Sequence, residues 1–239
     1  MLGETFDPNY EFLIRDGVRP HWSQAGVIVF ITARLHDSIP AEVLQRWECE
    51  KQDWMIRRGH QGHWSDVLPT LTESEQNAFR QHFNRCREDL LDDCLGACVL
   101  RDPENAAIVS DSLMHFDGQR YRMGDFVVMP NHIHLLAAFP DADTMTKQCD
   151  SWLHYTARQI NLRIGRSGKL WQQEPFDHLV RSAEQYEYLR QYIADNPIKA
   201  RLAPGSFLYR RYPDQSAATS QSESCQRRIS LREIRAPHQ

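Results

Sequence analysis

Residues 127–139 read VVMPNHIHLLAAF, a hydrophobic run that is typical of a buried β-strand and that carries two histidines one residue apart. Because side chains at positions i and i+2 of a strand point to the same face, His132 and His134 would present two imidazoles side by side. Such a pair is the beginning of a metal site, although two hydrogen-bonded core histidines would explain this stretch alone equally well. A third ligand from another part of the chain would favour the metal site.

The segments around this run predict an α+β protein. Residues 26–35, GVIVFITARL, and residues 120–129, RYRMGDFVVM, are rich in β-branched and apolar residues and are read as strands. Long helical patterns with recognisable start and stop residues lie between and after them. The order of these elements predicts helices packed on a mainly antiparallel sheet. The predicted helices cover residues 38–59, 71–99, 143–164 and 183–196.

The last of these helices supplies a candidate third ligand. Pro197 disfavours helical backbone in the residue before it, so we expect the helix to stop at Asn196. Tyr192 and Asn196 are four residues apart and therefore share one helical face. Two imidazole nitrogens and one amide oxygen leave open positions for phosphate oxygens, a set that suits Mg²⁺ or Mn²⁺ better than a structural zinc. A tyrosine hydroxyl one turn away is a candidate nucleophile.

Three segments carry a resemblance to a known family. MPNHIHLL at 129–136, GKLWQQEPFDHLVRS at 168–182 and YIADNPIKARL at 192–202 resemble, in this order, the signature segments of the REP-associated tyrosine transposases, a branch of the single-tyrosine HUH transposases. Residues 20–40, PHWSQAGVIVFITARLHDSIP, are similar to the first strand of that family.

The resemblance spans about residues 20–205 and implies an HUH nuclease domain with a ferredoxin-like or RRM-like core. Within it, residues from about 40 to 117 would form a helical insertion. Residues 206–239 fall outside it, and the last twenty-five of them are polar and rich in serine and glutamine, which predicts a flexible tail.

The resemblance also implies roles for individual residues. His132 and His134 would be the HUH metal ligands, Asn196 the third ligand, and Tyr192 the nucleophile of a single-stranded DNA endonuclease and strand transferase. Attack of the phenolate on a phosphodiester next to a palindromic hairpin would leave a 5′-phosphotyrosine link and a free 3′-hydroxyl. The implied cofactor is Mg²⁺ or Mn²⁺, and the implied partner is single-stranded or hairpin DNA.

Further residues are candidates for supporting roles. His178 and Arg181 would contact the scissile phosphate or support the metal site, or would form a structural hydrogen-bonded pair. Tyr188 and Tyr186 lie on the same helix as Tyr192, and we expect core packing or base stacking from them. Five basic residues are candidate contacts to the DNA backbone, with a solvated surface charge as the alternative for each. These are Arg166, Lys169, Arg190, Lys199 and Arg201.

The distribution of charge permits a DNA-binding face. The whole chain has a net charge of −4, but residues 151–239 carry 14 basic against 8 acidic side chains, a net charge of +6. Residues 1–150 carry 14 basic against 24 acidic side chains, a net charge of −10. The C-terminal half is therefore the part that we expect to contact nucleic acid.

Two rival functions stay open at the level of the sequence. One is a protein that binds hairpin DNA without cutting it, for which an intact set of His132, His134, Tyr192 and Asn196 would be unnecessary. The other is a hydrolase in which the two histidines act with a carboxylate, Asp125 or Asp177, and water is the nucleophile. Without a membrane-spanning or signal segment, we expect a cytoplasmic protein that does not bind membranes. A homodimer is an open alternative to a monomer.

Overall fold

The computed structural model describes residues 1–15, 21–173 and 175–212. Five strands form one sheet in which every neighbouring pair is antiparallel, in the order β6-β3-β5-β4-β7. Two short strands, β1 and β2, pair with each other in a separate hairpin. The strands are β1 (Leu13–Arg15), β2 (His21–Ser23), β3 (Ile28–Arg34), β4 (Arg122–Val128), β5 (His132–Ala138), β6 (Phe176–Leu179) and β7 (Leu208–Arg210).

Helices occupy the connections between these strands. Among the described residues, no helix combines the length and the apolar character needed to cross a membrane. The α-helices are α1 (Ala41–Ile56), α2 (Trp64–Val67), α3 (Glu73–Asp92), α4 (Pro103–Met114), α5 (Ala142–Arg163) and α6 (Ala183–Lys199), and the short 3₁₀ helices are η1 (Leu68–Thr70) and η2 (Val99–Arg101).

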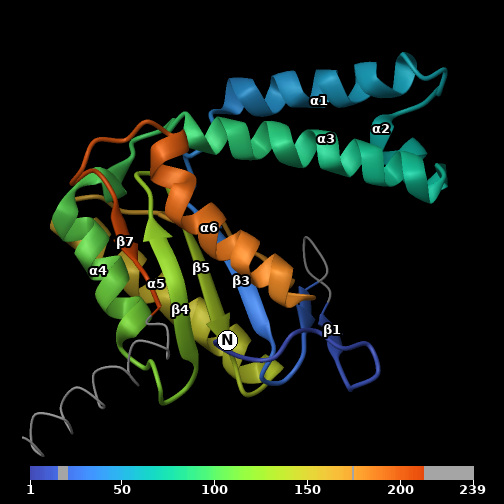
Figure 1. The fold of residues 1–239 in the computed structure, drawn as a ribbon. Coiled ribbons are helices and arrows are strands. Elements are labelled where there is room, and N and C mark those ends of the chain that lie inside the picture. The colour runs from blue at the N-terminus through green and yellow to red at the C-terminus, as the bar shows by residue number, and fades with distance from the viewer. Residues whose placement is uncertain (16–20, 174, 213–239) are drawn as a thin grey trace, which may run out of the picture.

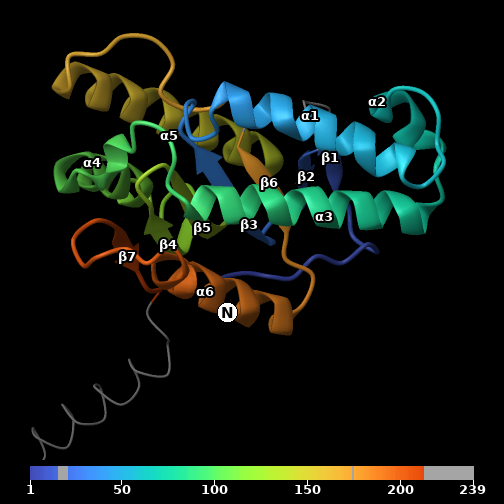
Figure 2. The same ribbon diagram turned by 90° about the horizontal axis from the view of Figure 1, so that it is seen from above.

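The core of the fold is a strand–helix–strand–strand–helix–strand unit made of β3, α4, β4, β5, α5 and β6. Its four strands lie in the sheet order 4-1-3-2, which is the ferredoxin-like arrangement. Helices α4 and α5 cover one face of the sheet, and α6 covers the other, as Figure 1 shows from the front and Figure 2 from above. The predicted α+β class with helices on an antiparallel sheet is confirmed.

Both faces of the central strands are buried, which explains their nearly continuous apolar sequence. Along β3, Val29 and Ile31 pack toward α4 and α5, whereas Ile28 and Phe30 pack toward α6. Each such side chain contributes about 1.5–3 kcal/mol on burial. The same alternation on β5 places His132 and His134 on the α6 face with Leu136.

Helices α1 and α3 form a hairpin that extends away from the sheet past one end of α6 (Figure 1). The hairpin has its own small hydrophobic cluster of Trp54, Met55, Phe79 and Phe83. The expected insertion from 40 to 117 is too long, because α4 packs against the sheet through Val109 and Leu113 in the main core. Leu100, before α4, belongs to the same core, so only the segment from α1 to α3 stands outside it.

The folded part of the chain also exceeds the expected limits at both ends. Leu2 is fully buried, and the backbone N–H of Phe6 donates to the carbonyl of Val180 at 2.7 Å. At the other end, β7 pairs with β4, so residues 206–212 are not a flexible tail. The rest of the expected tail, 213–239, lies outside the described residues.

Helix α6 differs from expectation at its end. It continues through Pro197 to Lys199 instead of stopping at Asn196. The restriction that proline places on the preceding residue is a bias, and here it is outweighed by packing, because Ile193, Asn196 and Pro197 are all buried against the sheet. Asn196 therefore lies inside the last turns of the helix.

Candidate active site

The two histidines lie on β5, the central strand of the five-stranded sheet, beneath α6. Across the sheet, His132 is opposite Arg34 and His134 is opposite Thr32, both on β3. Residues directly opposite each other on antiparallel strands carry their side chains on the same face, so all four side chains belong to the α6 face. His132 is 0% exposed and His134 is 3% exposed.

The Nδ1 atom of each imidazole is held by a neighbouring side chain. His132 Nδ1 lies 2.7 Å from Asn131 Oδ1, and His134 Nδ1 lies 2.8 Å from Thr32 Oγ1. The amide nitrogen of Asn131 donates to the carbonyl of Leu95, which turns its oxygen toward His132. An oxygen acceptor requires His132 Nδ1 to carry the proton, so Nε2 keeps its lone pair for a ligand.

Asn196 brings the third polar group into this buried layer. It is 0% exposed, and within the described residues neither its Oδ1 nor its Nδ2 has a hydrogen bond of ordinary geometry. The same is true of His132 Nε2. The amide nevertheless lies close enough to His132 to favour the protonated imidazole and raise its pKa. Buried polar atoms without partners are rare in folded proteins, and a divalent cation between them would satisfy both. The residues present therefore fit such a cation.

Burial keeps both imidazoles uncharged. Desolvation, followed by the positive charge of Arg34, lowers the pKa of His132 to about 3 against the smaller opposing effect of Asn196. Desolvation, with contributions from His132 and Arg34, also holds the pKa of His134 well below its usual value. Since only a neutral imidazole can bind a metal, both side chains are in the ligand form throughout the neutral pH range.

Tyr192 lies beside this histidine pair, one helical turn before Asn196. The centre of its ring is 5.2 Å from that of His134, at an interplanar angle of 67°, and 6.0 Å from that of Phe30. Lys199 places its Nζ 4.9 Å from the centre of the same ring. The structure thus brings together Tyr192, His132, His134 and Asn196, and all four come from a single chain.

The other tyrosines of α6 lie elsewhere. Tyr188 is 66% exposed, and its ring centre is 6.5 Å from that of Tyr192 on the outer side of the helix. Tyr186 is 2% exposed in the core beneath α6, where burial raises the pKa of its hydroxyl. Of the three, Tyr192 is the tyrosine with a ring contact to His134.

His178 and Arg181 are near the site but outside the histidine pair. His178 lies opposite Phe30 across the sheet, with 5.2 Å between the ring centres. Phe30 also stacks on His134, with 5.4 Å between the ring centres, so Phe30 lies between His178 and His134. Burial, together with the charge of Arg181, lowers the pKa of His178 to about 4. Arg181 itself is exposed.

The candidate DNA contacts divide into two groups. Four of the five are exposed, namely Arg166, Lys169, Lys199 and Arg201. Arg190 is only 8% exposed, and its Nε donates to Asp125 Oδ2 at 3.0 Å inside the protein. A guanidinium that is buried and paired in this way is a structural group, so the expectation of a phosphate contact at Arg190 is corrected.

The carboxylates of the rival hydrolase are not assembled with the histidines. Asp125 accepts from Arg190 and from the backbone N–H of Tyr212. Asp177 is opposite Ile31 on β3, hence on the other face of the sheet, and contacts His21. Within the described ranges, no three His, Cys, Asp or Glu side chains are grouped so that they could hold a metal ion. A histidine–carboxylate metal centre therefore has no support from the geometry.

The sequence alone does not identify three polar residues beside the histidines, namely Thr32, Arg34 and Asn131. Thr32 and Arg34 belong to residues 26–35, whose apolar and β-branched composition predicts a strand and nothing more. The alternation of GVIVFITARL places Phe30, Thr32 and Arg34 on one face, and the two polar side chains at its end were the available signal. The sequence alone also assigns no role to Asn131, which directly precedes His132.

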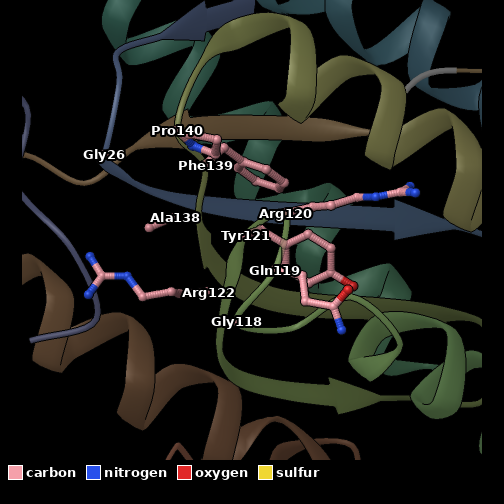
Figure 3. A pocket seen from close by; sticks show the side chains of 9 residues that line it. All are labelled: Gly26, Gly118, Gln119, Arg120, Tyr121, Arg122, Ala138, Phe139 and Pro140. Carbon is pink, nitrogen blue, oxygen red and sulfur yellow. The ribbon is translucent and has the colours of Figure 1, made fainter.

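A cavity of about 230 Å³ lies at the opposite end of the sheet, lined among others by Gly26, Tyr121 and Ala138. Ala138 ends the strand that His132 begins, so at about 3.3 Å per residue roughly 20 Å separates this cavity from His132. Arg120 and Arg122 border the cavity but point in opposite directions (Figure 3). They do not converge on one ligand.

Comparison with known proteins gives a distant structural similarity. The chain is similar to a solved structure described as the REP-associated tyrosine transposase bound to a REP hairpin, with 13% sequence identity and a TM-score of 0.40 over 77% of this chain and 74% of that chain. No protein-family model matches the chain, and no curated protein is significantly similar to it. At this identity and TM-score the similarity assigns no function, so the proposal below relies on the residues of the site.

Proposed function

We propose that this protein is a metal-dependent endonuclease and strand transferase for single-stranded DNA beside hairpins, and that Tyr192 is its nucleophile. The observation that carries the proposal is the position of the Tyr192 ring against His134, with Asn196 delivered to His132 by the same helix. The resemblance of the three sequence segments to REP-associated tyrosine transposases supports the same function.

His132 Nε2, His134 and the Asn196 oxygen would hold Mg²⁺ or Mn²⁺. When bound, the cation supplies electrostatic stabilisation of the charge that develops on the attacked phosphate. The protein prepares these ligands in advance: Asn131 and Thr32 orient the two rings, and burial keeps them neutral. Because ligands on packed strands and helices need little rearrangement, the site is suited to precise positioning of a phosphodiester.

The chemical step would be an exchange of one phosphodiester for another. The Tyr192 oxygen, after losing its proton to solvent, forms a bond to phosphorus while the bond from phosphorus to the 3′-oxygen breaks. The 3′-oxygen takes up a proton, and the downstream strand stays linked to Tyr192 through its 5′-phosphate. Attack by another 3′-hydroxyl reverses the step, and the similar energies of the two diesters keep the exchange nearly isoenergetic.

DNA would reach this site along the exposed basic side chains near the end of α6. Lys199 already lies over the Tyr192 ring, and Arg201 follows two residues later. Arg181, Arg166 and Lys169 are further exposed positive groups in the C-terminal half of the chain. Contacts of this kind bind phosphate without sequence preference, and they weaken steeply as the salt concentration rises.

A covalent-adduct assay tests the proposal. The protein is incubated with Mn²⁺ and a hairpin oligonucleotide labelled at its 3′ end, and the products are separated on a denaturing gel. We expect a labelled protein band that disappears in Tyr192→Phe, while this variant still binds the oligonucleotide. Tyr188→Phe is the matched control and should keep the band, because Tyr188 is exposed and is not in contact with the histidines.

Two outcomes would contradict the proposal. Binding without any adduct from the unsubstituted protein would indicate a hairpin-binding protein that does not cut. Cleavage that persists in Tyr192→Phe without a labelled protein band would indicate a hydrolase that uses water.

A further inference from the structure

A second cavity, of about 310 Å³, lies between α4 and α5, and the proposed nuclease site makes no use of it. The two helices run side by side on the face of the sheet opposite α6 (Figure 2). The cavity and the histidine pair are therefore on opposite sides of the sheet. Cavities that hold small ligands usually have volumes of about 300–1,000 Å³, so this one is large enough for a single small ring system.

The seam between the two helices is closed at one end and open at the other. At the start of α4, Arg163 near the end of α5 donates to Asp102 Oδ2 at 2.7 Å and to Asn105 Oδ1 at 3.3 Å. The end of α4 therefore lies against the first half of α5. Facing positions of packed helices are usually apolar, but here the cavity is lined by polar side chains, among them Ser112 of α4 and Gln148 of α5.

These two side chains form the most buried part of the cavity wall. Gln148 is 3% exposed and Ser112 is 9% exposed. Within the part of the chain that the structure describes, neither the Gln148 amide nor the Ser112 hydroxyl forms a hydrogen bond. Buried polar groups nearly always have a partner, so a molecule in the cavity is expected to supply one. Water can do so in the free protein, and a ligand with matching groups would displace it.

The rest of the lining determines which chemistry fits. Tyr155 is 52% exposed at the cavity, so its ring is available for stacking. Asp111 adds an exposed carboxylate in the last turn of α4, where the carbonyl groups of the helix end also carry partial negative charge. Among the described residues, no lysine or arginine lines this cavity. It therefore favours a flat ring with hydrogen-bond donors and disfavours a phosphate or a carboxylate.

We propose that the cavity between α4 and α5 binds a nucleobase that carries an exocyclic amino group, such as adenine or cytosine. The base stacks on Tyr155, as bases do on exposed aromatic side chains. The Gln148 amide offers the donor and acceptor pair that glutamine presents to adenine, and Asp111 accepts from an amino group as acidic side chains do from cytosine. The site does not depend on the proposed nuclease function. Its base is that of a free nucleoside or an unpaired base of single-stranded DNA.

Isothermal titration calorimetry with deoxyadenosine, deoxycytidine and thymidine tests the proposal. We expect the first two to bind the unsubstituted protein about tenfold more tightly than thymidine, because thymine has no amino group for Asp111. Asp111→Asn and Tyr155→Ala should each weaken deoxyadenosine binding about tenfold or more, through loss of a charged acceptor and of stacking. Asp143→Asn is the matched control and should bind normally, because the Asp143 side chain is 88% exposed on α5 and lies outside this cavity. Circular dichroism checks that each variant is folded.

Short oligo-dA and oligo-dT strands separate the two sources of the base. If the cavity takes an unpaired base of DNA, the unsubstituted protein should prefer oligo-dA, and Asp111→Asn should lose this preference. If it takes only free nucleosides, Asp111→Asn should change nucleoside binding alone.

Three results would overturn the proposal: no nucleoside binds at millimolar concentration, thymidine binds as tightly as deoxyadenosine, or both cavity variants bind like the unsubstituted protein. A protein that binds deoxyadenosine in this way but forms no covalent adduct with hairpin DNA would keep the cavity proposal and lose the proposed function.

Discussion

Replacing Arg190 by methionine would break an ion pair that lies inside the protein. Asp125 is 1% exposed and would lose the charge-assisted hydrogen bond from Arg190 Nε, with the backbone N–H of Tyr212 remaining as a donor. Removing one partner of a buried pair costs about 3–5 kcal/mol, and the remaining donor places the expected loss near the lower value. For a chain of this length, about 3 kcal/mol corresponds to a fall of roughly 6–12 °C in melting temperature.

The assay is thermal unfolding followed by circular dichroism, together with DNA binding below the melting temperature. Arg166→Met is the matched control, because Arg166 is exposed and should lose DNA affinity but little stability. The double variant Asp125→Leu with Arg190→Met should recover most of the lost stability, since it leaves no buried charge alone. A normal melting temperature with weakened DNA binding in Arg190→Met would refute the reasoning and return Arg190 to the DNA-binding surface.

Three further predictions concern the site. Asn196→Ala should weaken Mn²⁺ binding about tenfold or more in an equilibrium titration, whereas unchanged affinity would remove Asn196 from the ligand set. His132 and His178 have pKa values of about 3 and about 4 in the folded protein, below the unfolded value near 6.5, so the folded state binds fewer protons. Stability measured by urea unfolding should therefore fall as the pH drops from about 6.5 toward 4, by up to about 1.4 kcal/mol per pH unit for each histidine; His178→Phe should flatten this slope. Lys199→Gln and Arg201→Gln should weaken binding to all DNA sequences about equally and each reduce the salt dependence by about one charge, which filter binding at several salt concentrations would check.

The sequence predicted those features of the site that depend on local periodicity. Two histidines at i and i+2 of a strand must share a face, and a tyrosine and an asparagine at i and i+4 of a helix must do so too. These rules need no knowledge of the neighbouring elements. The structure brings the two pairs together because α6 packs on the face of β5 that carries the histidines.

The sequence could not predict features that depend on long-range pairing. Arg34 meets His132 only because β3 and β5 pair in one particular register, and a shift by one residue would turn Arg34 to the other face. Arg190 is buried because Asp125, 65 residues away, lies beneath it. The prediction that the helix ends at Asn196 was wrong for the same reason, because tertiary packing of α6 outweighed the local bias against helix before proline.

The insertion of α1 and α3 between β3 and α4 has a consequence for the speed of folding. The central strand pair joins residues far apart in the chain, as in the contact between Thr32 and His134, which are 102 positions apart. Contacts of such separation require a large loss of chain entropy before they stabilise anything, and folding slows as they become dominant. The α1–α3 hairpin has its own hydrophobic cluster, built from residues close together in the chain, so it can form first and bring its two ends together. Once formed, the helical hairpin would shorten the effective loop between β3 and β5 and so reduce the entropy cost of pairing these strands.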